Sequence, residues 1–223
     1  MRSLVVVTRA PGSPGSKTRL ADGIGAASSR RLQDAFLDDT VTWASSLDAA
    51  RVLAVHPPEG TGAMTARAPG FRIVGQHETS FGERMRGAVN AGFADGAGGP
   101  VVMIATDSPT VPESLVEQAW SAVSGSGGAD AAVAPADDGG WVAIGARAAL
   151  PPGCFDGVGW SAEGTLEDTT HALRAAGLAV VHVDGWYDVD TRDDLDRLAT
   201  ELRQDGARAL PATHAVLADI GML

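Results

Sequence analysis

The sequence predicts an α/β fold in which a mostly parallel sheet carries helices on both faces. Segments typical of strands and of helices alternate from residue 3 to residue 203 of the 223-residue chain, which is the order that builds parallel sheets. The run at residues 101–105 is apolar throughout, as is typical of a central strand covered on both faces. In such sheets ligands bind outside the carboxyl ends of the strands.

The first half of the chain is expected to alternate strands with two long helices. Strands are expected at residues 3–8, 51–56 and 71–74, and helices at about residues 28–48 and 80–93. Ser28 or Ser29 is the expected N-cap of the first helix, whose apolar residues recur at helical spacing from Leu32 to Leu47. Ser80 and Glu83 match a capping box at the start of the second helix. His56 ends its strand and is interpreted as a packing or surface residue.

Residues 9–20 follow the first strand and are expected to form a basic loop. The segment contains two prolines and two glycines, and Arg9, Lys17 and Arg19 give it three positive charges. Small residues and cations after a strand favour anion binding, although a solvated basic loop is the alternative. The spacing of glycines and lysine differs from that of a Walker A loop.

The second half of the chain continues the alternation and ends in a tail. Strands are expected at residues 101–105, 131–135, 141–145 and 178–183, and helices at about residues 112–123, 165–176 and 192–203. Asp137 to Gly140 predict a tight turn, and Gly177 predicts the end of a helix. Residues 1–203 are therefore expected to form one domain. Residues 204–223 would pack on this domain or on a second subunit, so a homodimer is one expected arrangement.

Composition excludes several classes of protein. The net charge of −11 and the isoelectric point of about 4.7 argue against nucleic-acid binding and against a basic membrane-binding surface. The single cysteine, Cys154, cannot form an intramolecular disulfide or a cysteine-only metal cluster. No apolar run approaches the roughly 20 residues of a membrane span, and the run from Leu4 to Val7 is too short for a signal peptide. The expected location is cytoplasmic.

Three aspartates are candidate metal ligands. Asp107 follows the apolar run at residues 101–105 after one residue, so its carboxylate should project into the crevice at the end of the strand. A carboxylate there suits a divalent metal or a ligand hydroxyl, and the alternative is a turn aspartate bonded to its own backbone. Asp188 and Asp190 point to the same side if their segment is extended, where they would repel each other unless a cation lies between them. Either Asp190 or Thr191 is expected to be the N-cap of the next helix.

Six motifs occur in order and carry a resemblance to a known family. They are RAPGSPGSKTRL (residues 9–20), FGERM (81–85), ATDSPTVP (105–112), DDGGWVAIG (137–145), FDGVGWSAEGTLEDT (155–169) and WYDVDTRDDL (186–195). Together they resemble the bacterial family DUF2064, described as radical-SAM/selenodomain-associated or GT-A type glycosyltransferases of the nucleotide-diphospho-sugar transferase superfamily. A more distant likeness is to the phospholactate and phosphoenolpyruvate guanylyltransferases of cofactor F420 synthesis. The resemblance implies a GT-A/Rossmann-like three-layer α/β/α sandwich.

The resemblance also implies roles for individual residues. Asp107, Asp188 and Asp190 would hold Mg²⁺ or Mn²⁺, and Asp107, Asp190 and Lys17 would be the catalytic residues. Binding of the nucleotide phosphates, or of an anionic group on the acceptor, would involve Arg9, Lys17, Thr18, Arg19, Gly82 and Arg84. The acceptor would be lined by Asp138, Gly140, Trp160 and Ser161.

The sequence departs from the family pattern in three places. The acidic turn of relatives is commonly Asp-Cys-Pro-Asp, whereas here Thr110 replaces the second carboxylate. We therefore expect any metal or acceptor contact at that position to be weakened. The basic loop begins with Arg9 where lysine is usual, and no Asp-x-Asp follows the central strand.

Two transferase chemistries fit these residues. In nucleotidyl transfer, a small phosphorylated or anionic acceptor attacks the α-phosphate of a nucleoside triphosphate, and the protein supplies alignment and charge neutralisation. The basic loop favours this reaction, because it suits the additional phosphates. The alternative is glycosyl transfer from a nucleotide sugar, which the family description favours. A non-catalytic nucleotide-binding protein, with Thr110 marking lost chemistry, is a third hypothesis.

Overall fold

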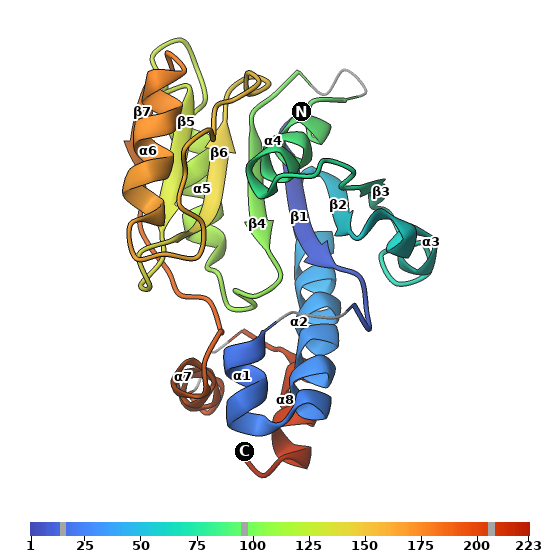
Figure 1. The fold of residues 1–223 in the computed structure, drawn as a ribbon. Helices are drawn as coiled ribbons and strands as arrows, with labels where there is room; N and C mark the ends of the chain where they lie inside the picture. Colours follow the sequence, from blue (N-terminus) through green and yellow to red (C-terminus); the bar gives the residue numbers. More distant parts are fainter. Residues whose placement is uncertain (14–16, 95–97, 205–207) are drawn as a thin grey trace.

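The described residues form a seven-stranded sheet with the order β3-β2-β1-β4-β6-β5-β7 (Figure 1). This computed structural model describes residues 1–13, 17–94, 98–204 and 208–223. The strands are β1 (Ser3–Arg9), β2 (Ala50–His56), β3 (Arg72–Gly75), β4 (Val101–Ala105), β5 (Ala131–Pro135), β6 (Trp141–Ala146) and β7 (Val180–His182). Strand β6 runs antiparallel to its neighbours β4 and β5, and the other pairs are parallel. The prediction of a mostly parallel sheet is confirmed.

Helices cover both faces of this sheet, as the sandwich architecture requires. The helices are α1 (Thr18–Ile24), α2 (Ala26–Ser46), α3 (Thr61–Met64), α4 (Phe81–Ala91), α5 (Glu113–Ala122), α6 (Thr165–Ala175), α7 (Arg192–Leu202) and α8 (Pro211–Asp219), with a 3₁₀ turn η1 at Pro58–Gly60. In β1, Leu4 and Val6 belong to the buried cluster that includes α2 and α5. Val5 and Val7 belong to the cluster on the other face, with α4 and α6. Alternate side chains of one apolar strand therefore serve two cores.

A third core lies beyond the end of the sheet, where α1, α7 and α8 gather around α2 (Figure 1). Leu20 of α1, Leu195 of α7 and Leu217 of α8 are each 0% exposed in it. Asp39 of α2 accepts hydrogen bonds from the first turn of α8, through the backbone N–H groups of Ala212 (3.1 Å) and Thr213 (2.8 Å). The tail thus packs on the body of the same chain.

The main departure from the predicted elements is helix α1 within the basic segment. Residues 9–13 have no helix, residues 14–16 lie outside the described residues, and α1 then begins at Thr18. Its position depends on Leu20, which is buried in a cluster with residues of α2, α7 and α8, so the local sequence alone could not indicate it. Helix α2 begins at Ala26, with Gly25 in place of the predicted serine as its N-cap. None of the helices in the described ranges has the length and apolar character needed to span a membrane.

Candidate active site

A cleft of about 600 Å³ opens at the carboxyl edge of the sheet. Arg9 ends β1, His56 ends β2, Gln76 follows β3 and Asp107 follows β4, and all four line the cleft. Adjacent parallel strands bring these positions together because their carboxyl ends meet at one edge. The predicted location of the site is therefore where the cleft lies.

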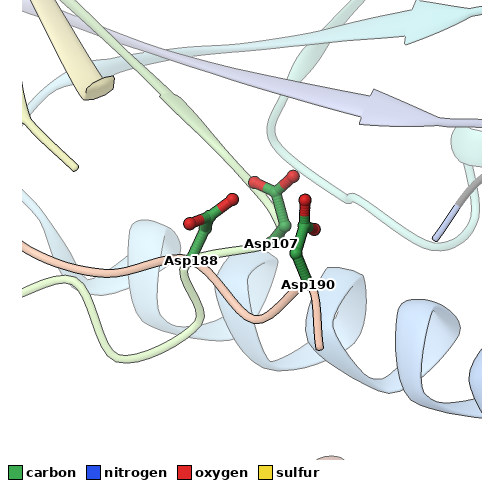
Figure 2. Close-up of side chains that lie close together, drawn as sticks. All are labelled: Asp107, Asp188 and Asp190. Carbon is green, nitrogen blue, oxygen red and sulfur yellow. The ribbon is translucent and has the colours of Figure 1, made fainter. Parts of the chain in front are cut away.

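The three predicted aspartates converge in this cleft. Figure 2 shows Asp107 rising from the end of β4, with Asp188 and Asp190 beside it on the segment that precedes α7. Each offers a carboxylate oxygen, and these oxygens lie within 4.8 Å of one another. The backbone N–H of Val189 donates to the carbonyl of Asp107 at 2.8 Å. That bond joins the two segments, so the convergence is set by backbone pairing.

The start of α7 leaves Asp190 available to the cleft. Thr191 is the N-cap, and its hydroxyl accepts from the backbone N–H of Asp194 at 3.3 Å. The Asp194 carboxylate accepts in return from the Thr191 N–H at 2.8 Å. This capping box resolves the choice between Asp190 and Thr191, because only Thr191 is used as the cap.

Lys17 lies between the aspartates and carries the neutralising charge. Its ammonium group is 3.4 Å from Asp107 Oδ2 and forms a shorter ion pair with Asp190 Oδ1. Only 8% of the Lys17 side chain is exposed. Arg19 pairs with the other oxygen of Asp190 at 2.8 Å but is 61% exposed. The backbone of Lys17 is left-handed, with φ of 52°, a conformation that is uncommon outside glycine.

The charges in this group shift the pKa values of Asp188 and Asp190 in opposite directions. Burial, followed by the charges of Asp107 and Asp190, raises the pKa of Asp188 to about 7. Burial also opposes ionisation of Asp190, but the charges and hydrogen bonds of Lys17 and Arg19 outweigh it and lower the pKa of Asp190. The pKa of Lys17 is raised because Asp107 and Asp190 outweigh the effect of its burial.

The chemistry of these ligands fits a divalent metal. Asp107, Asp188 and Asp190 offer only oxygen atoms, the ligands that Mg²⁺ and Mn²⁺ prefer. Three carboxylates face one lysine and one exposed arginine, and burial together with the charges of Asp107 and Asp190 raises the pKa of Asp188 to about 7. A cation shared by the three carboxylates would favour the ionised form of Asp188.

The predicted phosphate-binding residues divide into those at the cleft and those outside its lining. Arg9, Lys17, Arg19 and Arg84 line the cleft, whereas Thr18 is exposed and outside the lining. Gly82 is buried in the first turn of α4 and also lies outside the lining. A Cβ there would lie 3.0 Å from Phe155 Cβ and 3.4 Å from the Trp160 ring. The small size of Gly82 therefore serves packing under Trp160.

All four predicted acceptor residues line the cleft: Asp138, Gly140, Trp160 and Ser161. The turn between β5 and β6 is tied to the first turn of α6 by the Leu166 N–H, which donates to the Gly139 carbonyl at 2.8 Å. A Cβ on Gly139 would lie 2.1 Å from the carbonyl oxygen of Glu163, so the close approach requires glycine. Ser161 has a φ of 60°. Among the described non-glycine residues, only Ser161 and Lys17 have positive φ, and both line the cleft.

Thr110 takes no part in the cleft, which corrects the expectation from the family pattern. It is 5% exposed and lies outside the cleft lining. Its hydroxyl accepts from Trp186 Nε1 at 3.1 Å and donates to the Tyr187 hydroxyl at 3.3 Å. The tail holds the same turn, because the Arg208 guanidinium donates to the carbonyls of Pro109 (3.2 Å) and Val111 (2.6 Å). Threonine there weakens no contact among the three aspartates.

Several cleft residues were not predicted from the sequence. They include Arg30, His56, Gln76, Phe81, Trp141 and Glu163. Burial, followed by the charges of Arg84 and Arg9, lowers the pKa of His56, so this side chain is neutral at pH 7. The sequence did hold an indication that His56 and Gln76 could line the cleft, because they lie at or just after the ends of consecutive predicted strands. Arg30 and Glu163 lie on a helix and in a loop whose orientation the sequence pattern does not give.

Comparisons with known proteins give the family and the fold. The model of a family described as "Uncharacterized protein conserved in bacteria (DUF2064)" matches residues 40–162. No curated protein matches the chain in sequence. Among solved structures, a provisionally named nucleotide-diphospho-sugar transferase from Desulfovibrio desulfuricans G20 is similar, with a TM-score of 0.82 and 28% identity. The match covers 98% of this chain and 94% of that one.

Two more distant structures share the fold. A cytidylyltransferase from Leptospira borgpetersenii has a TM-score of 0.57 at 11% identity, over 98% of this chain and 94% of its own. A 4-diphosphocytidyl-2C-methyl-D-erythritol synthase from Anaerococcus prevotii has a TM-score of 0.56 at 15% identity, over 91% of this chain and 99% of its own. At these identities the likeness concerns the fold alone, and it agrees with the predicted three-layer sandwich.

Proposed function

The chain belongs to the DUF2064 family, and we propose that it is a metal-dependent transferase that moves a nucleotidyl group from a nucleoside triphosphate to a small acceptor. The observation that carries the proposal is the convergence of Asp107, Asp188 and Asp190 around the buried ammonium of Lys17. A cluster of carboxylates beside cations is what a metal-bound polyphosphate requires. The similar structure from Desulfovibrio, named as a nucleotide-diphospho-sugar transferase, supports a nucleotide substrate.

Cations are concentrated at the cleft although the protein is strongly acidic. The net charge is −11 with only 17 lysines and arginines, yet Arg9, Lys17, Arg19, Arg30 and Arg84 all line this one cavity. We refer to the first four of these residues as the cationic side, because Arg84 lies over the ring of Phe81, which contacts Trp160. A triphosphate carries more charge than the diphosphate of a nucleotide sugar, so the number of cations favours the triphosphate.

The residues of the chain would act by binding and by neutralising charge. Asp107, Asp188 and Asp190 would hold Mg²⁺ or Mn²⁺, which when bound supplies positive charge against the phosphate oxygens. Lys17 and Arg9 would bind phosphate oxygens and disperse the charge that develops on the leaving pyrophosphate. The rigid turn after β4 would keep the site aligned, which is the larger part of catalysis in phosphoryl and nucleotidyl transfer.

Glycosyl transfer is the second candidate. It is favoured by the partly exposed Trp160, which packs edge-on against Phe81 at 4.7 Å and would suit a sugar ring in the cleft. The name of the Desulfovibrio structure also favours a nucleotide sugar. In this reaction the same residues would stabilise a departing nucleoside diphosphate.

A thermal-shift screen of nucleoside triphosphates and nucleotide sugars with Mn²⁺ tests the proposal. The expected result is that a triphosphate raises the Tm more than the nucleotide sugars do, and that turnover releases pyrophosphate. Release of nucleoside diphosphate from a nucleotide sugar would instead support glycosyl transfer. Nucleotide binding without turnover over a wide acceptor panel would indicate a non-catalytic nucleotide-binding protein, and no nucleotide binding would overturn the proposal.

A further inference from the structure

We propose that the acceptor is an uncharged or cationic polyhydroxy compound, such as a sugar or another polyol, and not a phosphorylated or carboxylated one. This inference rests on the proposed function and names the substrate class of the same cleft. It replaces the anionic acceptor that the sequence led us to expect. Two observations carry it: the distribution of charge along the cleft, and the aromatic side chains that line one part of it.

Charge divides the cleft into two parts. The wall opposite the cationic side comes from residues 136–142 and 160–165, and we call it the aromatic side. Among the described residues that line the aromatic side there is no lysine, arginine or histidine, but Asp138 and Glu163 are present. The order of the strands separates the two sides, because β1 and the β5–β6 turn lie on opposite sides of β4. The phosphates of the nucleotide therefore have four cations on one side, and the other side is left for the acceptor.

An anionic acceptor would meet two carboxylates on the aromatic side and a single arginine at its border, Arg84, which lies over the Phe81 ring at 5.4 Å. Asp138 and Glu163 would repel it. A hydroxyl group has the opposite preference, because it can donate a hydrogen bond to a carboxylate oxygen.

The aromatic rings form a surface suited to a flat, weakly polar ligand. Trp160 is partly exposed and has edge-on contacts with Phe81, Phe155 and Trp141, at centroid distances of 4.7, 5.9 and 6.2 Å. The face of an aromatic ring carries a negative electrostatic potential. It therefore attracts the C–H groups of a sugar ring or a cation, and it disfavours an anion.

The loop that carries Trp160 is held in place from behind. The buried Thr165 hydroxyl donates to the carbonyls of Gly159 (2.8 Å) and Ala162 (2.7 Å). Asp138 is held as well, because its Oδ1 accepts from the Gly140 N–H at 2.9 Å. A ligand surface that is fixed before binding loses less conformational entropy when the ligand arrives.

The transfer step is balanced with such an acceptor. The acceptor oxygen forms a bond to the α-phosphorus, and the bond from that phosphorus to the bridging oxygen breaks. The electron pair of the broken bond leaves with pyrophosphate, and the hydroxyl proton passes to solvent water.

Direct binding of matched compounds tests the inference without relying on turnover. The probes are glucose, glucosamine and glycerol against glucose 6-phosphate and glycerol 3-phosphate. Binding is followed by saturation-transfer NMR with excess Mg²⁺. We expect glucose or glucosamine to bind at least about tenfold more tightly than glucose 6-phosphate, a difference of about 1.4 kcal/mol. Tighter binding of a phosphorylated member, or no binding of any uncharged or cationic member, overturns the inference.

Variants show whether binding occurs at the aromatic side. Trp160→Ala should abolish binding of glucose, and Trp160→Phe should retain part of it. Asp138→Asn should raise the affinity for glucose 6-phosphate severalfold. Asp137→Asn is the matched control, because the neighbouring Asp137 pairs with Arg197 at 2.6 Å outside the cleft lining and should leave the affinity unchanged. Equal effects of the Asp137 and Asp138 substitutions would contradict the assignment.

The nucleotide-induced Tm shift, measured on the same variants, separates the two proposals. If nucleotides bind but the protein shows no Trp160-dependent preference for uncharged or cationic sugars over phosphorylated ones, the acceptor inference fails and the proposed function stands. If nucleotides do not bind but the preference is present, the proposed function fails and the sugar-binding surface stands.

Discussion

The Lys17 ammonium nitrogen and Asp107 Oδ2 lie 3.4 Å apart in the cleft. The two residues are nevertheless held in place by different interactions. Asp107 follows a central strand, and the backbone on both sides of it is paired. The Thr106 N–H donates to the Val7 carbonyl at 3.2 Å, and the Asp107 carbonyl accepts from Val189 at 2.8 Å. The position of this carboxylate is therefore fixed by the backbone hydrogen bonds at the end of the strand.

Lys17 has less backbone support. It is the N-cap of a seven-residue helix, has a left-handed backbone and makes no side-chain cap. Its side chain is fixed by ion pairs with Asp107 and Asp190, so its position depends on the charge of the cleft. The comparison indicates that the carboxylate part of the site is built by the fold, whereas the ammonium group can exchange its partners when a metal or a phosphate enters.

The largest effect on turnover is expected when the negative charge of Asp107 is removed. Asp107→Asn should lower turnover by about a hundredfold or more, since even residues that only support metal ligands cost 10–100-fold when they are changed. The Tm should stay close to that of the wild type, because the loss of the ion pair with Lys17 is offset by relief of the repulsion with Asp188. Steady-state kinetics with Mn²⁺, together with thermal unfolding, measure both.

The matched control for this variant is Asp22→Asn. Asp22 is exposed on α1, outside the cleft lining, so the same chemical change there should leave turnover unaltered. Wild-type activity in Asp107→Asn would show that Asp107 has no role in metal binding. Asp190→Asn is expected to abolish turnover as well, although it also removes the partner of Lys17 and Arg19.

The sequence predicted those parts of the site that backbone geometry fixes. Asp107 could be placed because an apolar strand ends just before it, and parallel strands bind ligands at that edge. Asp188 and Asp190 could be paired because extended chain turns alternate residues to one side. The capping residues near Asp190 could be narrowed to two, and the side-chain bonds of Thr191 then decided between them.

Features that depend on contacts distant in sequence could not be predicted. Helix α1 is stabilised by burying Leu20 in a cluster that joins residues of α2 to residues from the end of the chain, and no local pattern reports the contacts with the end of the chain. The direction of Thr110 depends on Trp186 and Tyr187, some 76 residues away in sequence. The packing of Gly82 against Phe155 is likewise invisible in a motif.

A smaller effect is expected when Lys17, whose side chain is held in the cleft by ion pairs, is replaced. Lys17→Ala should weaken nucleoside triphosphate binding by about tenfold to a hundredfold, the range for loss of a hydrogen bond to a charged group. The substitution should change the Tm less with Mn²⁺ than without it, because the bound metal neutralises the charge of the carboxylates. Calorimetric titration gives the affinity.

Arg19→Ala is the matched control for Lys17→Ala. Arg19 binds the same aspartate but is 61% exposed, and exposed ion pairs contribute little. Its loss should weaken binding by less than about fivefold. An unchanged affinity in Lys17→Ala, or a larger loss in Arg19→Ala, would contradict a direct role for the buried ammonium.

The smallest effect is expected in the pH dependence of stability, and it arises from Asp188. Its pKa is about 7 in the folded protein and about 4 in the unfolded chain. The folded state therefore binds the proton more tightly than the unfolded state does. The resulting stabilisation is complete below about pH 4 and is lost as the pH rises through about 7. Without metal, the Tm of the wild type should fall relative to that of Asp188→Asn between pH 5 and pH 8, and added Mn²⁺ should remove most of the difference. Parallel curves of Tm against pH for the two proteins would show that the pKa of Asp188 is not raised in the folded protein by burial and by the charge of Asp107.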